Sequence, residues 1–344
     1  MNTNNATPPP PPPRMKASDL PDISKEPPLR ETTSSHNASE QLPGYSITTS
    51  DSDLATLPPS QLFELNQAAI DDAAQSPNIP LIGVLTKLED LREEYIRGNQ
   101  TFVKQINYLG QKNFLGIRRT RGDGDCFYRS FSFAYIERLL KSSPDVRWFL
   151  VEDALAKLSG TKSLLKRAGY EEAVFEDFYE EIELLLKRIL NKASTAPPLT
   201  QRGLLDAFND APVSNSITVY MRYITAAEIK TSPNYAPFLF NPDFGNEMDA
   251  IEFCNCFVDP IGVEADQVQI TALTTALQVD LDVAYLDGHE HPFPSGIQAQ
   301  PDMSYVNVHQ FENGDGFRPI VLLYRPGHYD VLSEMSADPQ EGLF

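Results

Sequence analysis

The stretch Gly122–Arg129, GDGDCFYR, decides the fold. It places a thiol directly after a glycine-rich turn, and Cys126 begins an apolar pattern with helical spacing. The partial positive charge at a helix N-terminus favours the thiolate that a nucleophilic cysteine must supply. Gly122 and Gly124 allow a sharp turn before the helix, and N–H groups there, including that of Cys126, can stabilise a developing oxyanion.

The stretch Tyr324–Asp330, YRPGHYD, supplies the complementary groups. In extended chain the side chains of His328 and Asp330 fall on the same face of the strand. The carboxylate then accepts from one ring nitrogen while the other nitrogen faces the thiol. A nucleophile, a base and a group that orients the base are the minimum for covalent acyl transfer. The two stretches together predict a cysteine protease with Cys126, His328 and Asp330 as its catalytic residues.

Alternative roles for these residues fit the sequence less well. A lone cysteine in an apolar pattern is usually a small core residue, and only the neighbouring glycines favour the nucleophile. A calcium loop counted from Asp123 would need glycine at its sixth position and glutamate at its twelfth, where this chain has Tyr128 and Ala134. The Gly-Lys-Ser/Thr of a phosphate loop is also missing. No metal or cofactor is expected.

Two further clusters point to structure rather than to chemistry. Cys254 and Cys256 are two positions apart on an expected helix, so their thiols point apart and a metal or redox pair is not favoured. The tripeptide His289–His291 lies beside Pro292 and Pro294 and predicts a solvent-exposed loop.

The chain's 344 residues allow two average domains, or one large domain with appendages. The unbroken prolines of Pro8–Pro13 and the polar chain after them predict a disordered N-terminal arm over residues 1–57. The proline run is a stiff spacer, or a ligand for an aromatic groove on a partner. Residues 58–335 are expected to form one catalytic domain, followed by a short acidic tail over 336–344.

The net charge and the number of cysteines limit the partners and the cellular compartment that are expected. The chain has 48 acidic and 28 basic residues, a formal charge of −20, which disfavours nucleic acid and anionic membranes as partners. This acidity favours a partner with a basic surface, or only keeps the protein soluble. No stretch has the pattern of a membrane span or a signal peptide, and the 3 cysteines are too few for a disulfide framework. We expect a soluble protein of the reducing cytoplasm, with the nucleus as an alternative.

The apolar patterns predict an α+β fold, a helical lobe packed on a small, mostly antiparallel sheet. A long amphipathic helix is expected from Leu81 to Ile106, broken near Gly98, and then a loop or poor strand over 110–121. The other expected helices cover 126–139, 151–158, 175–189, 217–229, 248–257 and 269–276. The expected strands cover 279–286, 319–324 and 329–332, the last two joined by a tight turn.

At these two stretches the sequence resembles the otubain branch of the OTU (ovarian-tumour) cysteine deubiquitinases. Residues 123–129 resemble its cysteine box and residues 324–330 its histidine box, and the likeness covers roughly Leu81 to Leu332. It implies a papain-like fold that hydrolyses the isopeptide bond after the C-terminal glycine of ubiquitin through a thioester. By position, Cys126 is then the nucleophile, His328 the base and later the acid, and Asp330 the orienting group.

The resemblance also implies an oxyanion hole in the backbone of Asp123, Gly124 and Asp125. Asp125 stands where the family usually has asparagine. Activity survives this change if only the backbone of Asp125 serves, whereas a charge felt by the sulfur would disfavour the thiolate. Gln267 stands where the family tends to have histidine, in a region that resembles a contact with the ubiquitin tail.

The implied partners are ubiquitin and polyubiquitin chains, with ubiquitin-conjugating enzymes as a further class. An aromatic segment, with Tyr235, Phe238, Phe240 and Phe244, either contacts the distal ubiquitin or fills the lobe's own core. The residues expected to bind substrate are Phe238, Phe240, Glu264, Gln267, Tyr324 and Pro326. An alternative function is a non-catalytic module that binds ubiquitin-conjugating enzymes and restrains chain synthesis. A peptidase for ordinary peptides has only the shared chemistry in its favour.

Overall fold

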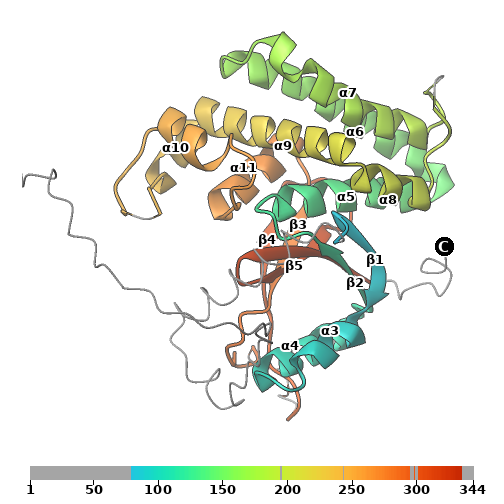
Figure 1. Cartoon of the computed structure of the whole chain (residues 1–344), viewed down its shortest axis with the longest axis vertical. Coiled ribbons are helices and arrows are strands. Elements are labelled where there is room, and N and C mark those ends of the chain that lie inside the picture. The colour runs from blue at the N-terminus through green and yellow to red at the C-terminus, as the bar shows by residue number, and fades with distance from the viewer. Residues whose placement is uncertain (1–78, 194–195, 243, 295–297, 299–300, 335–344) are drawn as a thin grey trace, which may run out of the picture. The chain divides into compact units, whose positions relative to one another are not determined.

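The computed structural model describes residues 79–334, except 194–195, 243, 295–297 and 299–300. All of these residues belong to one unit, Thr49–Phe344. The predicted arm over 1–57 and the predicted tail over 336–344 lie outside the described residues. Within the unit, helices cover both faces of a twisted sheet (Figure 1).

The sheet has six strands in the order β1-β2-β6-β5-β3-β4. Every neighbouring pair is antiparallel except β3 and β5, which run parallel. The predicted mostly antiparallel sheet is therefore confirmed, and so is the α+β class. The strands are β1 (Ile82–Lys87), β2 (Gly116–Thr120), β3 (Leu281–Tyr285), β4 (Asn307–Phe311), β5 (Ile320–Arg325) and β6 (His328–Ser333).

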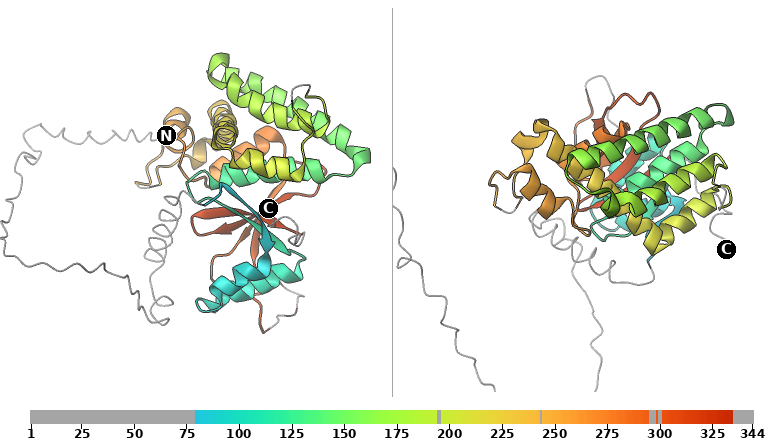
Figure 2. Two further views of the ribbon diagram at one scale, coloured as in Figure 1. Left: turned by 45° about the vertical axis from the view of Figure 1, so that its right-hand side comes forward. Right: turned by 90° about the horizontal axis from the view of Figure 1, so that it is seen from above.

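Side-chain alternation explains why both faces are covered. Leu322 of β5 packs into the large core beneath the helical lobe, while its neighbour Leu323 packs into a smaller core on the opposite face. Val331 and Leu332 of β6 divide in the same way. The smaller core is closed by α3 (Leu88–Tyr95) and α4 (Gln100–Gln111), which lie apart from the other helices (Figure 2).

The helical lobe is built around α9 (Ala211–Thr231), which contacts α5 to α8, α10 and α11. The predicted helices from Cys126 to Ala276 are all confirmed, but the one expected over 151–158 is much longer and covers Pro144–Arg167. No helix in the described part of the chain has the length and hydrophobicity needed to cross a bilayer. The other members of the lobe are α5 (Cys126–Lys141), α6 (Pro144–Arg167), α7 (Glu172–Ile189), α8 (Gln201–Asn209), the 3-10 helix η2 (Pro233–Phe238), α10 (Ala250–Phe257) and α11 (Gln267–Leu277).

The predicted long helix from Leu81 to Ile106 is wrong in its first part, where residues 82–87 form strand β1. The pairing of β1 with β2 shifts register between Ile82 and Leu85. Because of this shift, both side chains are buried although the two residues are three positions apart. An irregularity of this kind imitates helical spacing in a strand. The expected break near Gly98 is confirmed, because it separates α3 from α4. The stretch 110–121, expected as a loop or poor strand, contains β2, while β4 and α8 were not predicted.

Candidate active site

Cys126 is the first residue of α5, as the sequence predicts. Its side chain is buried, with 3% of the residue exposed. One turn further on, the Ser130 hydroxyl donates to the carbonyl oxygen of Tyr329 at 3.2 Å and lies 2.7 Å from the Thr120 hydroxyl. These bonds fix the cysteine helix to β2 and β6, the strands that carry the rest of the site.

His328 and Asp330 begin β6, directly after a hairpin in which Arg325 pairs with His328. Gly327 has a φ of 73°, a left-handed conformation that glycine adopts without strain. The ring Nε2 of His328 lies 2.9 Å from Oδ1 of Asp330. The prediction that both side chains share one face of the strand is therefore confirmed.

Asp330 is fully buried and receives donors on both carboxylate oxygens. Oδ1 also accepts from the backbone N–H of Thr120 at 2.9 Å, and Oδ2 accepts from Nε and Nη2 of Arg325 at 3.1 and 2.6 Å. Burial alone would raise the pKa of this carboxyl, but the charges of Arg325 and His328 hold the pKa of Asp330 well below its usual range. The group that orients the histidine is thus a fixed carboxylate.

His328 is held ready to carry a proton. Burial in itself lowers the pKa of the imidazole, but the charges of Asp330 and Cys126 outweigh it and raise the pKa of His328 to about 10. The second ring nitrogen, Nδ1, is buried and has no partner at ordinary hydrogen-bond geometry among the residues that the structure describes. The contact between thiol and imidazole is therefore looser than the contact between imidazole and carboxylate, and substrate binding can tighten it.

The loop before Cys126 differs in detail from the expected oxyanion hole. The N–H of Asp123 donates to the Arg121 carbonyl, and the N–H of Asp125 donates to the Asp123 side chain, each at 3.1 Å. Within the described part of the chain, this leaves the N–H groups of Gly122, Gly124 and Cys126 without a hydrogen bond. Those of Gly124 and Cys126 are nearest to the thiol along the chain, and they are the donors that we assign to an oxyanion.

The carboxylate of Asp125 is directed to a buried arginine. Its Oδ1 accepts from Nε of Arg222 at 2.9 Å and from the N–H of Gly262 at 3.1 Å. Arg222 is fully buried, and its charge compensates that of Asp125 beside the thiol. Of the two consequences foreseen for Asp125, this geometry favours the one in which activity survives. No sequence pattern indicated Arg222, because a lone arginine in a helix usually faces solvent.

The residues expected at the ubiquitin tail lie near the start of α11 and in the hairpin of β5 and β6. Glu264 and Gln267 are exposed where α11 begins, and Nε2 of Gln267 is 3.5 Å from Nδ1 of His309. The Tyr324 ring packs at a tilt against the rings of Tyr285 and Tyr329, with ring centres 4.8 and 5.1 Å apart. The pKa of Tyr324 is raised, mainly by burial and further by the nearby charges of Glu264 and Cys126. Pro326 lies in the adjoining turn and is half-buried.

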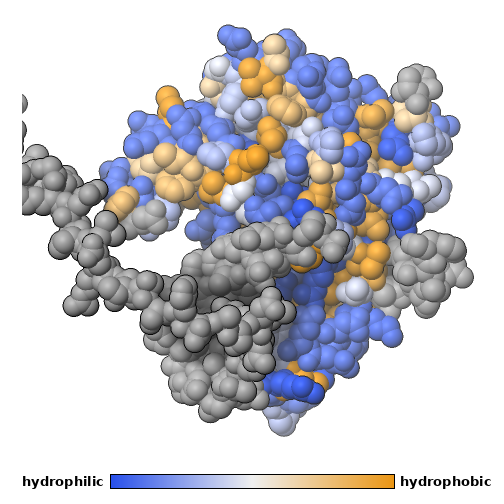
Figure 3. Space-filling model, in the orientation of Figure 1, coloured by the Kyte–Doolittle hydropathy of each residue, from blue (hydrophilic) through white to orange (hydrophobic). Residues whose placement is uncertain are grey.

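The aromatic segment divides between surface and core. Phe238 is 65% exposed, Phe240 42% and Phe244 82%, whereas Tyr235 is buried. The alternative that the segment fills the lobe's own core holds for Tyr235 alone. Figure 3 shows apolar residues over this side of the lobe, near α10.

The cysteine pair and the histidine loop lie away from this site. Cys254 is buried and Cys256 exposed, so their thiols do point apart. The residues from His289 to His291 form a loop, where His291 Nε2 contacts Asp287 at 2.6 Å. Among the described residues, no group of three or more His, Cys, Asp or Glu side chains could hold a metal ion.

A family model described as Peptidase C65 Otubain matches residues 74–334. The chain belongs to the otubain family. This membership confirms the family, the fold and the cysteine-peptidase class that the sequence predicted.

Individual proteins that are similar to this otubain are consistent with the family assignment. The ovarian-tumour-domain deubiquitinating enzyme 1 of Arabidopsis thaliana is 33% identical over 261 residues, covering 75% of this chain and 82% of the relative. Human ubiquitin thioesterase OTUB1 is 31% identical over 253 residues, covering 74% and 83%. A solved complex of OTUB1 with ubiquitin aldehyde and UBCH5B~Ub superposes with a TM-score of 0.61 at 28% identity, covering 80% of this chain and 98% of that chain.

Proposed function

We propose that this otubain is a deubiquitinase that hydrolyses the isopeptide bond after the C-terminal glycine of ubiquitin. The observation that carries the proposal is the arrangement of Cys126, His328 and Asp330, in which a buried carboxylate orients an imidazole beside a thiol at a helix N-terminus. Its relatives are named ubiquitin thioesterases and deubiquitinating enzymes, which supports ubiquitin as the substrate.

The reaction follows from these positions. The Cys126 sulfur attacks the glycine carbonyl carbon, and the oxygen that becomes negative is met by the N–H groups of Gly124 and Cys126. His328, which carries the thiol's proton, gives it to the departing lysine amine, leaving a thioester on Cys126. A water then attacks the thioester while His328 removes its proton, and the sulfur leaves as ubiquitin's carboxylate is released. Asp330 keeps Nε2 of His328 protonated throughout, so that Nδ1 exchanges the proton.

The low exposure of the site suits a thin substrate. Cys126 is 3% exposed and His328 6%, so a globular protein reaches them only through an extended tail without large side chains. Glu264 and Asp266 lie close enough to Tyr324 to affect its titration, and thus form an acidic rim near the thiol. The tail of ubiquitin is basic, and we propose that Glu264, Gln267, Tyr324 and Pro326 guide it to Cys126.

We further propose that Phe238 and Phe240 contact the distal ubiquitin, because an exposed apolar patch suits the apolar recognition surface of ubiquitin. The variants Phe238→Ala and Phe240→Ala should stay folded, since neither residue belongs to the buried core, and should bind ubiquitin more weakly. Unchanged affinity in both folded variants would reject this contact.

The test of the main proposal is a reaction with ubiquitin that bears an electrophile at its C-terminus, followed by mapping of the adduct. We expect a covalent bond to Cys126, and no chain cleavage by Cys126→Ala although it still binds ubiquitin. An adduct on Cys256, the exposed thiol, or full hydrolysis by Cys126→Ala would refute the proposal.

A second candidate function is restraint of ubiquitin-conjugating enzymes. It is favoured by solved otubain complexes that contain UBC13~Ub or UBCH5B~Ub. It can accompany hydrolysis, because it does not require the thiol. If it holds, Cys126→Ala still slows chain synthesis in a purified conjugation reaction; if synthesis proceeds at its normal rate, this function is excluded.

A further inference from the structure

A single buried side chain, Arg222 of α9, joins the two loops that flank the thiol. On the cysteine loop its guanidinium donates to Oδ1 of Asp125 and to the carbonyl oxygen of Gly124, the latter at 3.2 Å. On the loop between α10 and α11 it donates to the carbonyl oxygens of Val258 and Val263, at 3.0 and 2.6 Å. Arg222 has no exposed surface, so these bonds are shielded from water.

The two loops also contact each other directly. The N–H of Gly262 donates to Oδ1 of Asp125 at 3.1 Å. A Cβ atom at Gly124 would lie 2.1 Å from the Gly262 carbonyl oxygen, far inside van der Waals contact. A shift of either loop therefore moves the backbone of Gly124, whose N–H is one of the unbonded donors next to the thiol.

A second side chain of α9 contacts the loop between α10 and α11. Lys230 lies further along the helix, and its ammonium is 3.0 Å from the carboxylate of Asp259, the residue after Val258. The Tyr170 hydroxyl donates to the same carboxylate at 2.7 Å. The loop is thus held at Val258 and Val263 by Arg222, and between them by Lys230 and Tyr170.

We infer that Arg222 is a positioning residue for the hydrolysis proposed above. It holds Gly124 so that the N–H groups of Gly124 and Cys126 converge on the oxyanion, while Asp125 supplies the counter-charge that permits a guanidinium to be buried there. Oxyanion donors act only if they are in place before the charge develops. Loss of the arginine should therefore slow the chemical step more than it weakens the binding of ubiquitin.

A purely structural role makes a different prediction. The guanidinium also lies 4.4 Å from the centre of the Tyr128 ring, so Arg222 contributes to the packing of the core. If packing were its whole role, a folded variant that fills the same space would retain normal turnover. Arg222→Met keeps the volume without the charge or donors, and Arg222→Lys keeps the charge without the fork of donors.

The experiment measures three quantities for each folded variant: kcat for a ubiquitin C-terminal amide, affinity for ubiquitin aldehyde, and the rate of Cys126 alkylation by iodoacetamide. The aldehyde adds to the thiol and forms an oxyanion, whereas alkylation forms none. We expect kcat and aldehyde affinity to fall together, by roughly ten- to a hundredfold, since one oxyanion donor is worth about 10²–10³ in kcat. In Arg222→Lys, which keeps the counter-charge of Asp125, alkylation and affinity for unmodified ubiquitin should change less than about threefold.

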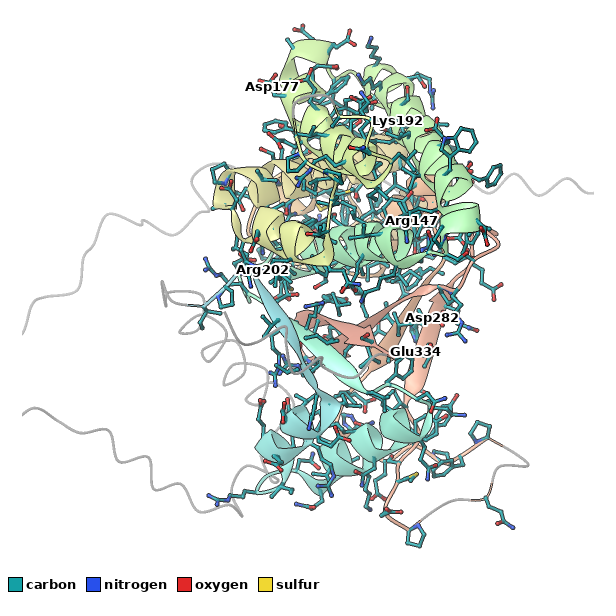
Figure 4. The ribbon with its side chains drawn as sticks, turned by 90° about the vertical axis from the view of Figure 1, so that its right-hand side faces the viewer. Arg147, Asp177, Lys192, Arg202, Asp282 and Glu334 are labelled. Carbon is teal, nitrogen blue, oxygen red and sulfur yellow. The ribbon has the colours of Figure 1, made fainter. Side chains whose placement is uncertain are left out.

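Arg202→Gln is the matched control, because Arg202 forms an exposed ion pair with Asp206 on α8, outside the site (Figure 4). Normal kcat in a folded Arg222→Met or Arg222→Lys variant would overturn the inference. So would an equal fall of alkylation and turnover in Arg222→Lys, where the counter-charge of Asp125 remains. Should Arg222→Met fail to fold, Arg222→Lys carries the same test. Absence of ubiquitin hydrolysis by the unmodified chain would instead overturn the proposed function, and this inference with it.

Discussion

Replacement of Asp330 by asparagine tests the site most directly, because four donors converge on this carboxylate. His328 and the N–H of Thr120 bond to Oδ1, and two nitrogens of Arg325 bond to Oδ2. An amide offers one accepting oxygen and an NH₂ group that only donates. If the oxygen stays with Arg325, the NH₂ group faces the histidine, and Nε2 must accept. The proton of the neutral ring then sits on Nδ1, which can no longer take the proton of the thiol.

The size of the effect follows from this change of tautomer. The corresponding change in a serine triad lowers kcat about 10⁴-fold, and we expect a smaller loss here, roughly 10²–10³-fold, because a thiol ionises more easily than a hydroxyl. The fold also loses stability, since Arg325 keeps its charge with 19% of its side chain exposed and no carboxylate opposite. Breaking a buried ion pair costs about 3–5 kcal/mol of stability. Because the amide oxygen of the asparagine can still accept from Arg325, we expect a loss of about 3 kcal/mol in the free energy of unfolding.

The assay measures kcat/KM for a ubiquitin C-terminal amide between about pH 6 and about pH 9, together with urea unfolding. Asp206→Asn is the control, because it removes a carboxylate from an exposed pair with arginine. A folded Asp330→Asn variant whose turnover stays within about threefold of the unmodified chain across this range would refute the assigned role of Asp330.

Three other predictions concern His328, Gly124 and Ser130. The pKa of His328 is raised from 6.5 to about 10, so the protonated imidazole stabilises the fold fully below about pH 6.5 and this stabilisation is lost as the pH rises towards 10. In His328→Gln, the free energy of unfolding measured in urea should therefore change less with pH over this range. Gly124→Ala should lower kcat at least about tenfold, because the added methyl group would meet the Gly262 carbonyl and the residue has a φ of 76°. The control is Gly262→Ala, whose methyl group has 3.6 Å of room and which should lose only about 1–2 kcal/mol of stability from its positive φ. Equal kcat in the two variants would contradict this prediction. Ser130→Ala should lower the free energy of unfolding by about 1–2 kcal/mol through the lost bond to Tyr329, and an unchanged unfolding midpoint would disprove that link.

Much of the helical lobe was predictable, because regular apolar spacing reports the buried face of a helix such as α7, which buries Phe175, Tyr179, Ile182, Leu185 and Leu186. The sheet was harder. The register shift in β1 gave a strand the spacing of a helix, and β4, an edge strand whose residues are mostly exposed, has little apolar alternation to detect.

The residues proposed as catalytic could be singled out because each stands in a short segment whose local geometry limits its role. Cys126 follows a glycine turn, and His328 and Asp330 are two positions apart in a strand. Their supports could not be found in this way. Arg222 reaches Asp125 from a helix in another part of the chain, and Thr120 acts through its backbone N–H, which any residue other than proline would provide. Such contacts depend on packing between distant segments, which apolar periodicity does not encode.

The thiol and its base come from distant parts of the chain, and only the docking of α5 on β6 brings them together. The hairpin of β5 and β6 is local and can assemble early, but on its own it carries a histidine with nothing to activate. Hydrolytic capacity should therefore emerge only once α5 has docked on β6. Nascent or partly denatured copies of this chain would be inert towards conjugates in the cell, without any inhibitor to keep them so.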